Sequence, residues 1–305
     1  MHVSSRHVLR QGPMLATLGK TAARALSQSL RKGANGKSSV VTPGPEFRRT
    51  FAPLPDDLLD QYIAHVGGDP RAYKGIVPSH FFPQWSMPVA AEALAALPYP
   101  ILRVLNAGCR MQVHKQLPRK EALHVRAQLA AIDDDGKRAL ITTRVITGTD
   151  SVPDALETEI YAFVPLSSKS ENGKGKPAKS EKPRVPEGSH EIAFSKLHAD
   201  AGLSFAKLTG DFNPIHWVPA YARASGFRNV ILHGFGTFAR ACEGLNRGLL
   251  GGDVRRLKLL EAKFTRPLVL PHAVGVYVRQ REVYVGDGIQ GPAYMTGHFE
   301  TGDNA

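Results

Sequence analysis

The sequence predicts an α+β protein built from one unit that occurs twice. A polar segment, residues 167–188, separates two stretches of equal length, residues 50–166 and 189–305. Each stretch contains a loop, a helical segment and several β-rich segments in the same order, which is typical of a helix packed on one face of an antiparallel sheet. With 305 residues and a hydrophobic fraction of 42%, the chain can bury a core in each unit.

The polar segment from Ser167 to Gly188 is rich in Lys, Ser, Gly and Pro and contains almost no apolar residues. Such a segment cannot bury enough apolar surface to offset the entropy lost on ordering. We therefore expect a flexible linker over residues 167–188 between two domains.

The two stretches also resemble each other at matching places. Residues 62–70 echo residues 205–214, and both segments contain Gly-Asp shortly before Pro. Residues 76–81 precede a helical stretch over 89–97, just as residues 230–235 precede a helical stretch over 237–245. Strand-like runs follow each helical stretch, at 110–113, 123–132 and 139–146 in the first unit and at 258–265 and 273–278 in the second. This pattern indicates a duplicated unit whose copies have diverged.

The net charge of +12 invites the interpretation of a nucleic-acid-binding protein. However, residues 1–49 carry a net charge of +8 and residues 168–187 a net charge of +3, so the two domains are close to neutral. A groove that binds nucleic acid has its basic residues on the folded domain. We therefore expect no nucleic-acid partner.

The basic N-terminal segment, residues 1–49, has no acidic residue before Glu46. It is interpreted as a loosely attached tail, with two alternatives: an amphipathic helix in weak contact with a membrane surface, or a mitochondrial transit peptide. We expect a cytoplasmic protein, with the mitochondrial matrix as the alternative, and no membrane span. The helical alternative rests on an apolar stripe formed by Leu15, Leu18, Ala22, Leu26 and Leu30.

The densest chemical pattern lies between residues 205 and 240. Asp211 and His216 stand five residues apart in a Gly- and Pro-containing loop, and Pro214 between them argues against a regular helix. Gly234 stands at the start of the next helix, where backbone N–H groups lack intrahelical partners and the helix dipole favours negative charge. A carboxylate, an imidazole and a free N–H donor suit the reversible addition of water to a double bond conjugated with a thioester.

This stretch resembles the signature of the MaoC-like, (R)-specific enoyl-thioester hydratases, also called hydratase 2. Their pattern is G-D-x-N-P-x-H, followed by H-G at the start of a long helix. The flanking halves resemble the family members that contain two hot dogs, including 3-hydroxyacyl-thioester dehydratases. The resemblance implies a double hot-dog fold, two repeats each with a long helix wrapped by a curled antiparallel sheet. The matching residues are Gly210, Asp211, Asn213, Pro214, His216, His233 and Gly234.

The resemblance also implies roles for individual residues. Asp211 and His216 would hold the catalytic water and transfer protons, and the backbone N–H of Gly234 would donate to the thioester carbonyl. Asn213 and His233 are the candidate substrate-binding residues. For both we keep a structural alternative, in which Asn213 shapes the loop and His233 holds the turn into the helix.

In the first half, the position five residues after Asp69 is Lys74 rather than histidine. The resemblance therefore implies a degenerate N-terminal repeat that helps to house the acyl chain, and one active site per chain. Some family members have a serine where Cys242 stands here. Cys109 and Cys242 lack the spacing of metal ligands, and two cysteines cannot form a disulfide framework.

The function expected from the sequence is the reversible dehydration of (R)-3-hydroxyacyl thioesters in fatty acid metabolism, with substrates carried on coenzyme A or acyl carrier protein. No metal or redox cofactor is implied, and a homodimer or a monomer is expected. Two alternatives stay open: a hot-dog thioesterase and a non-catalytic acyl-thioester binding protein. Arg240 and Arg266 are interpreted as solvated cations in preference to contacts with a phosphate of coenzyme A.

Overall fold

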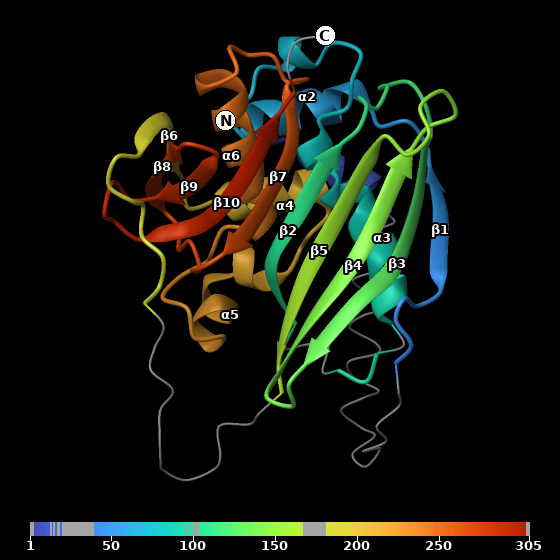
Figure 1. Cartoon of the computed structure of the whole chain (residues 1–305), viewed down its shortest axis with the longest axis horizontal. Coiled ribbons are helices and arrows are strands. Elements are labelled where there is room, and N and C mark those ends of the chain that lie inside the picture. The colour runs from blue at the N-terminus through green and yellow to red at the C-terminus, as the bar shows by residue number, and fades with distance from the viewer. Residues whose placement is uncertain are drawn as a thin grey trace.

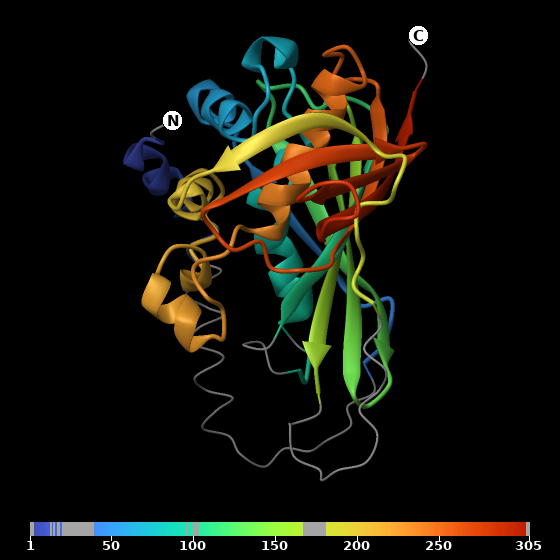
Figure 2. The same ribbon diagram turned by 90° about the vertical axis from the view of Figure 1, so that its left-hand side faces the viewer.

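The computed structural model describes residues 3–12, 14, 16, 19, 40–95, 97–99, 104–166 and 181–302. Its centre is one antiparallel sheet of ten strands, which curls around two long helices (Figures 1 and 2). None of the helices in these ranges is long and apolar enough to span a bilayer.

The order of the strands shows that the two halves are copies of one unit. The sheet has the order β1-β3-β4-β5-β2-β7-β10-β9-β8-β6. Reading outward from the central β2–β7 pair, each half contributes its second, fifth, fourth, third and first strand. The strands are β1 Glu46–Phe51, β2 Leu105–Val113, β3 Leu123–Asp134, β4 Arg138–Gly148, β5 Leu156–Pro165, β6 His190–Leu197, β7 Leu257–Phe264, β8 His272–Arg279, β9 Glu282–Gly286 and β10 Ala293–Thr301.

The helices repeat in the same way. Each half contains a short helix and a long helix, α2 and α3 in the first and α4 and α6 in the second (Figure 1). The long helices pack on the sheet, whereas α2 and α4 pack on each other. Their bounds are α2 Asp56–His65, α3 Pro83–Leu94, α4 Ala201–Thr209, α5 Pro219–Ala224 and α6 Gly234–Gly248, with 3₁₀ turns at η1 Ser5–Arg10, η2 Pro70–Tyr73, η3 Ser79–Phe81 and η5 Pro214–His216.

Helix α6 is almost entirely buried, because every residue from 235 to 246 is covered by the sheet or by the other helices. Gly244 allows this close packing, since an added Cβ would lie 3.1 Å from the side chain of Val276 on β8. Helix α3 begins six residues before the expected start at residue 89. Its first residue is Pro83, and proline is well tolerated in the first turn, where its missing N–H would have no partner.

The two halves share a core, because aromatic rings from both meet where α2, α3, α4 and α6 pack. The ring of Phe82 lies edge-on to those of Phe235 and Phe238, with centroids 5.4 and 6.1 Å apart. Tyr62 on α2 and Phe205 on α4 occupy matching positions of the repeat, and their ring centroids are 6.2 Å apart. Aromatic pairs at these separations stabilise the contact beyond the area that they bury. The halves therefore behave as one packing unit.

The described part of the N-terminal segment differs from the expected loose tail. Turn η1 packs on the fold, with His7 and Gln11 fully buried, and strand β1 begins at Glu46, inside the segment assigned to the tail. The proposed apolar stripe from Leu15 to Leu30 lies outside the described residues.

Residues 167–180 of the expected linker also lie outside the described ranges. The remainder of this segment is ordered on the second half, since Val185 is fully buried and pairs with Ile289. Its contacts with β10 and the β9–β10 loop include backbone hydrogen bonds, the Arg184 side chain on the Gln290 carbonyl and the Gln290 side chain on Glu187, and composition alone does not reveal them.

Candidate active site

The loop between α4 and α5 is shaped by two local structures. Helix α4 ends at Thr209 and is capped by Gly210, whose φ of +84° is a left-handed conformation that glycine adopts without strain, so the chain turns away before Asp211. The side chain of Asn213 then accepts a hydrogen bond from the N–H of Ile215 at 3.3 Å and caps turn η5. Turn η5 places His216 at its last position. The sequence therefore brings Asp211 and His216 to one side of the loop without a continuous helix between them.

The imidazole of His216 is held in one tautomer. Its Nδ1 donates to the carbonyl oxygen of Ile231 at 2.8 Å, which leaves the lone pair of Nε2 free. The side chain is buried, and burial lowers its pKa from the ordinary value of 6.5, although the Asp211 carboxylate and the Ile231 carbonyl oppose the shift. His216 is therefore a neutral imidazole with an available basic nitrogen at neutral pH.

His233 lies directly against His216. The two rings stack with centroids 3.6 Å apart and planes inclined by 24°. The Nε2 of His233 donates to the backbone carbonyl of Asp211 at 2.9 Å. Burial, together with the neighbouring His216, lowers the pKa of His233 to about 3. This histidine therefore stays neutral and ties the backbone of Asp211 to the start of α6.

Gly234 opens helix α6 directly after His233, so its N–H belongs to the first turn, where intrahelical acceptors are lacking. An added Cβ at this position would lie 2.7 Å from the ring of Phe264, so the site has no room for a larger residue. The Asp211 side chain, by contrast, is 35% exposed, and it is the accessible member of the group. A ligand can therefore approach the group from the side of Asp211.

The structure thus brings three of the predicted residues together. Asp211, His216 and His233 each offer one potential ligand atom, and these atoms lie within 4.8 Å of one another. His216 Nδ1 and His233 Nε2 each donate to a backbone carbonyl, so each ring has only one nitrogen lone pair left for a cation. The arrangement suits proton transfer better than metal binding. Asn213 is exposed and its side chain caps the turn, a position that fits loop shaping better than contact with a substrate.

The expectation for Arg240 is wrong. This residue is buried on α6, where it donates to the carbonyls of Gly236 at 2.8 Å and of His65 at 3.2 Å. Burial lowers its pKa to about 10. Because His65 is the last residue of α2, the guanidinium lies at the negative end of that helix dipole. Arg266 is held similarly, by the carbonyls of Lys182 and Pro183. The His65 acceptor of Arg240 and both acceptors of Arg266 are distant in the sequence, so no local pattern reveals them.

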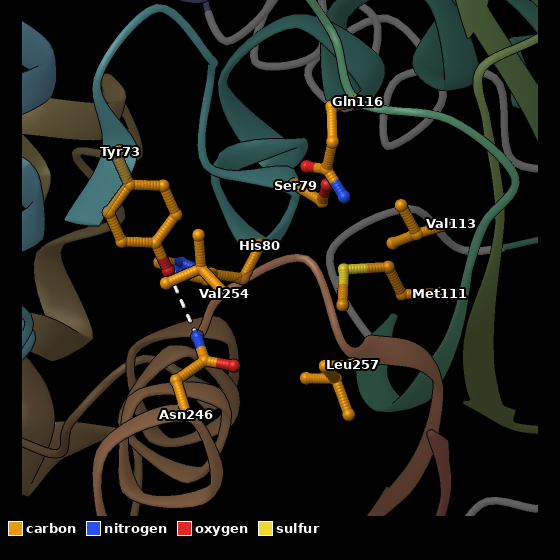
Figure 3. A pocket seen from close by; sticks show the side chains of 9 residues that line it. All are labelled: Tyr73, Ser79, His80, Met111, Val113, Gln116, Asn246, Val254 and Leu257. Atoms are coloured by element: carbon orange, nitrogen blue, oxygen red, sulfur yellow. Dashed lines mark hydrogen bonds between the residues drawn. The ribbon is translucent and has the colours of Figure 1, made fainter. Parts of the chain in front are cut away.

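The corresponding position in the first half contains a buried polar cluster that sequence reasoning missed. Tyr73 ends turn η2 as His216 ends η5, and its hydroxyl donates to Glu243 on α6 at 2.5 Å. His80 Nε2 lies 2.8 Å from the same carboxylate oxygen, and Asn246 donates to the Tyr73 hydroxyl at 3.0 Å (Figure 3). The adjoining cavity has a volume of about 10 Å³, room for a single water molecule.

The first half also lacks an equivalent of the free Gly234 amide. Phe81 follows His80 as Gly234 follows His233, but the N–H of Phe81 donates to the carbonyl of Pro78 at 2.9 Å. The acid and base groups of this half are therefore already paired. An open hollow of about 580 Å³ beside the cluster is lined partly by the charged side chains of Asp69, Arg71, Glu243 and Arg247, which do not suit an acyl chain.

The fold is shared with solved structures. A MaoC-like dehydratase from Phytophthora capsici matches with a TM-score of 0.67 over 86% of this chain and 96% of that one, at 21% identity. A Mycobacterium tuberculosis protein described as having a double hot-dog fold matches with a TM-score of 0.56 over 86% and 96% of the two chains, at 14% identity. The molecule is a double hot-dog protein, as the sequence predicts.

Sequence comparison finds a similarity between the second half of the chain and a known protein family. Residues 178–296 match the family model of the MaoC like domain. The probable enoyl-CoA hydratase 2 of Dictyostelium discoideum is 25% identical over 187 residues, which cover 60% of this chain and 63% of that protein. The match thus spans less than two thirds of the relative's length. Residues 178–296 are thus similar to a MaoC like domain, and the predicted resemblance is confirmed.

Proposed function

We propose that this protein catalyses the reversible hydration of trans-2-enoyl thioesters, which in reverse is the dehydration of (R)-3-hydroxyacyl thioesters. The observation that carries the proposal is the position of the His216 imidazole, which is anchored through Nδ1 and lies beside Asp211 and His233, directly before the N-terminus of α6. The names of the relatives, a hydratase and a dehydratase, support the same reaction class.

In this proposal, His216 Nε2 removes a proton from the water whose oxygen bonds to C3 of the substrate. The His216 and Asp211 side chains share the proton transfer and deliver one proton to C2, so that one water adds across the double bond. Negative charge develops on the thioester oxygen as the C3–O bond forms, and the N–H of Gly234 at the helix N-terminus is the donor that stabilises it. Dehydration follows the same steps in reverse.

The proposal includes substrates carried on coenzyme A or acyl carrier protein, a role in fatty acid metabolism and a cytoplasmic location. It needs no redox cofactor, because adding water transfers no electrons between reactants. It places one active site in each chain, since the corresponding groups of the first half are paired with each other.

The test follows the absorbance of the conjugated enoyl thioester with crotonyl-CoA and longer enoyl-CoA substrates, together with an assay for free thiol. Hydration lowers the absorbance without releasing thiol, and this is the expected result. Release of thiol would indicate a thioesterase instead. Binding of the substrate with neither change would indicate a non-catalytic binding protein, and either outcome would overturn the proposal.

A further inference from the structure

We propose that Gln11 is a positioning residue for the catalytic loop. The inference rests on the proposed function, because it concerns the aspartate of that site. It assigns the packed N-terminal turn η1 and the residues that follow it a role in catalysis.

The side-chain amide of Gln11 bonds to the end of α4. The side chain is fully buried, and its Nε2 donates to the carbonyl of Leu208 at 2.8 Å and to that of Lys207 at 3.3 Å. These carbonyls belong to the last turn of α4, where they lack intrahelical partners. Gln84 on α3 donates to the Gln11 Oε1 at 3.4 Å and orients the amide. Gln11 thus caps the helix that ends two residues before Asp211.

The same segment also covers the turn itself. An added Cβ on Gly210 would lie 2.7 Å from the Cβ of Met14 and 3.1 Å from the Cβ of Gln11, so both residues pack directly on this glycine. Gly210 is the left-handed residue that directs the chain from α4 to Asp211. The N-terminal segment therefore contacts the turn that sets the direction of the catalytic carboxylate.

Other contacts hold the segment in place across both halves of the molecule. Arg6 and Arg10 form ion pairs with Asp57 on α2, and His7 Nε2 lies 2.9 Å from the side-chain oxygen of Gln61. Figure 2 shows the N-terminal turn in dark blue beside the yellow helix α4. With one side fixed to α2, the segment can restrain α4 and the loop that follows it.

We expect the loss of the Gln11 amide to lower kcat and to leave KM nearly unchanged. Without the Gln11 amide, two carbonyls of α4 lose their donor, and the Gly210 turn can rotate Asp211 away from His216. A displacement of about 1 Å at a reacting group costs on the order of a hundredfold in rate. Substrate contacts remote from Asp211 stay in place, so KM changes little.

The experiment compares full-length Gln11→Leu, which keeps the size of the side chain and removes the donor, with Leu9→Ala on the exposed face of η1. For Gln11→Leu we expect a tenfold to hundredfold lower kcat for enoyl-CoA hydration, a KM within about threefold of the wild type, and faster hydrogen exchange of the amides of residues 210–212. Leu9→Ala should match the wild type in all three measurements. An unchanged kcat, or unchanged exchange at residues 210–212, in Gln11→Leu would overturn the inference.

If Gln11→Leu does not fold, Met14→Ala carries the same test, because it removes the Met14 side chain beyond Cβ, including the Cγ that would lie 2.9 Å from an added Cβ on Gly210, and it keeps the hydrogen bonds of Gln11. A tenfold lower kcat in that variant supports the inference and an unchanged kcat overturns it. Wild-type protein without hydratase activity would instead contradict the proposed function. In that case the exchange comparison still decides whether Gln11 holds the loop.

Discussion

The imidazole of His216 stacks on that of His233 with the ring centroids 3.6 Å apart. Protonation of either ring would place a charge in a buried site against its neighbour, so the pair is neutral at neutral pH. One nitrogen of each ring donates a hydrogen bond to a backbone carbonyl. His216 donates to Ile231, and His233 donates to Asp211. The stacked pair therefore fixes the base and the backbone of the carboxylate residue in one arrangement.

The first prediction concerns the two residues that transfer protons. Asp211→Asn and His216→Ala should each lower kcat/KM for enoyl-thioester hydration by about 10²- to 10⁴-fold, because each removes an acid–base group. The matched control is His298→Ala on strand β10, whose side chain is half exposed and lies outside the site. Wild-type turnover in both site variants would contradict the assignment of the site.

The second prediction concerns pH. His216 must be neutral to accept a proton, and burial lowers its pKa below 6.5. The kcat/KM for hydration should therefore fall at acid pH with a midpoint below 6.5, as His216 becomes protonated. The measurement is a pH profile with crotonyl-CoA. An acid limb centred above pH 7 would show that a different group carries the base function.

The third prediction concerns space at the start of α6. Gly234→Ala places a methyl group 2.7 Å from the ring of Phe264, so either the ring or the helix N-terminus must shift. Losing an aligned donor to a developing oxyanion costs about 10²- to 10³-fold in kcat, and we expect a decrease of this size. The double variant Gly234→Ala/Phe264→Ala has room for the methyl group and should recover much of the activity. Failure to recover would mean that the clash is not the cause.

The fourth prediction concerns the buried cluster that joins the halves. Glu243→Ala leaves His80 Nε2 and the Tyr73 hydroxyl without their acceptor, and it should lower the free energy of unfolding by about 3 kcal/mol. Tyr73→Phe removes one hydroxyl and should cost about 1 kcal/mol. Urea unfolding measures both values. If Glu243→Ala lowers the free energy of unfolding by less than Tyr73→Phe does, the carboxylate does not stabilise the contact between the halves.

The sequence predicts the repeat because each copy keeps its own order of loop, helix and strands, and these are local patterns. It also predicts the Asp211–His216 pair, since Gly210 and Pro214 fix a short loop through their own backbone preferences. Such features depend on residues close together in the chain, and the structure agrees with them.

The features that sequence reasoning missed depend on partners far away in the chain. Hydrogen bonds join Gln11 to Leu208, Arg240 to His65 and His80 to Glu243. The partners in each pair are more than 160 residues apart in the sequence. The interpretation of Arg240 as a solvated cation is wrong because its guanidinium is buried and donates to two backbone carbonyls, one of them at the negative end of the α2 dipole. Buried polar contacts between the two repeats leave no periodic pattern in either sequence.

The fifth prediction follows from the buried histidines and concerns acid stability. Burial lowers the pKa of His65 and of His233 to about 3, whereas an unfolded histidine has a pKa of about 6.5. Between these values the unfolded state binds a proton that the folded state does not, so the free energy of unfolding falls as pH decreases. Each such histidine should contribute a loss of about 1 kcal/mol between pH 6 and pH 5. His65→Gln removes one of these groups, so its unfolding free energy should fall less steeply than that of the wild type, whereas His298→Gln at an exposed site should leave the slope unchanged. Parallel slopes for the wild type and His65→Gln in urea unfolding would show that His65 is not held neutral by burial.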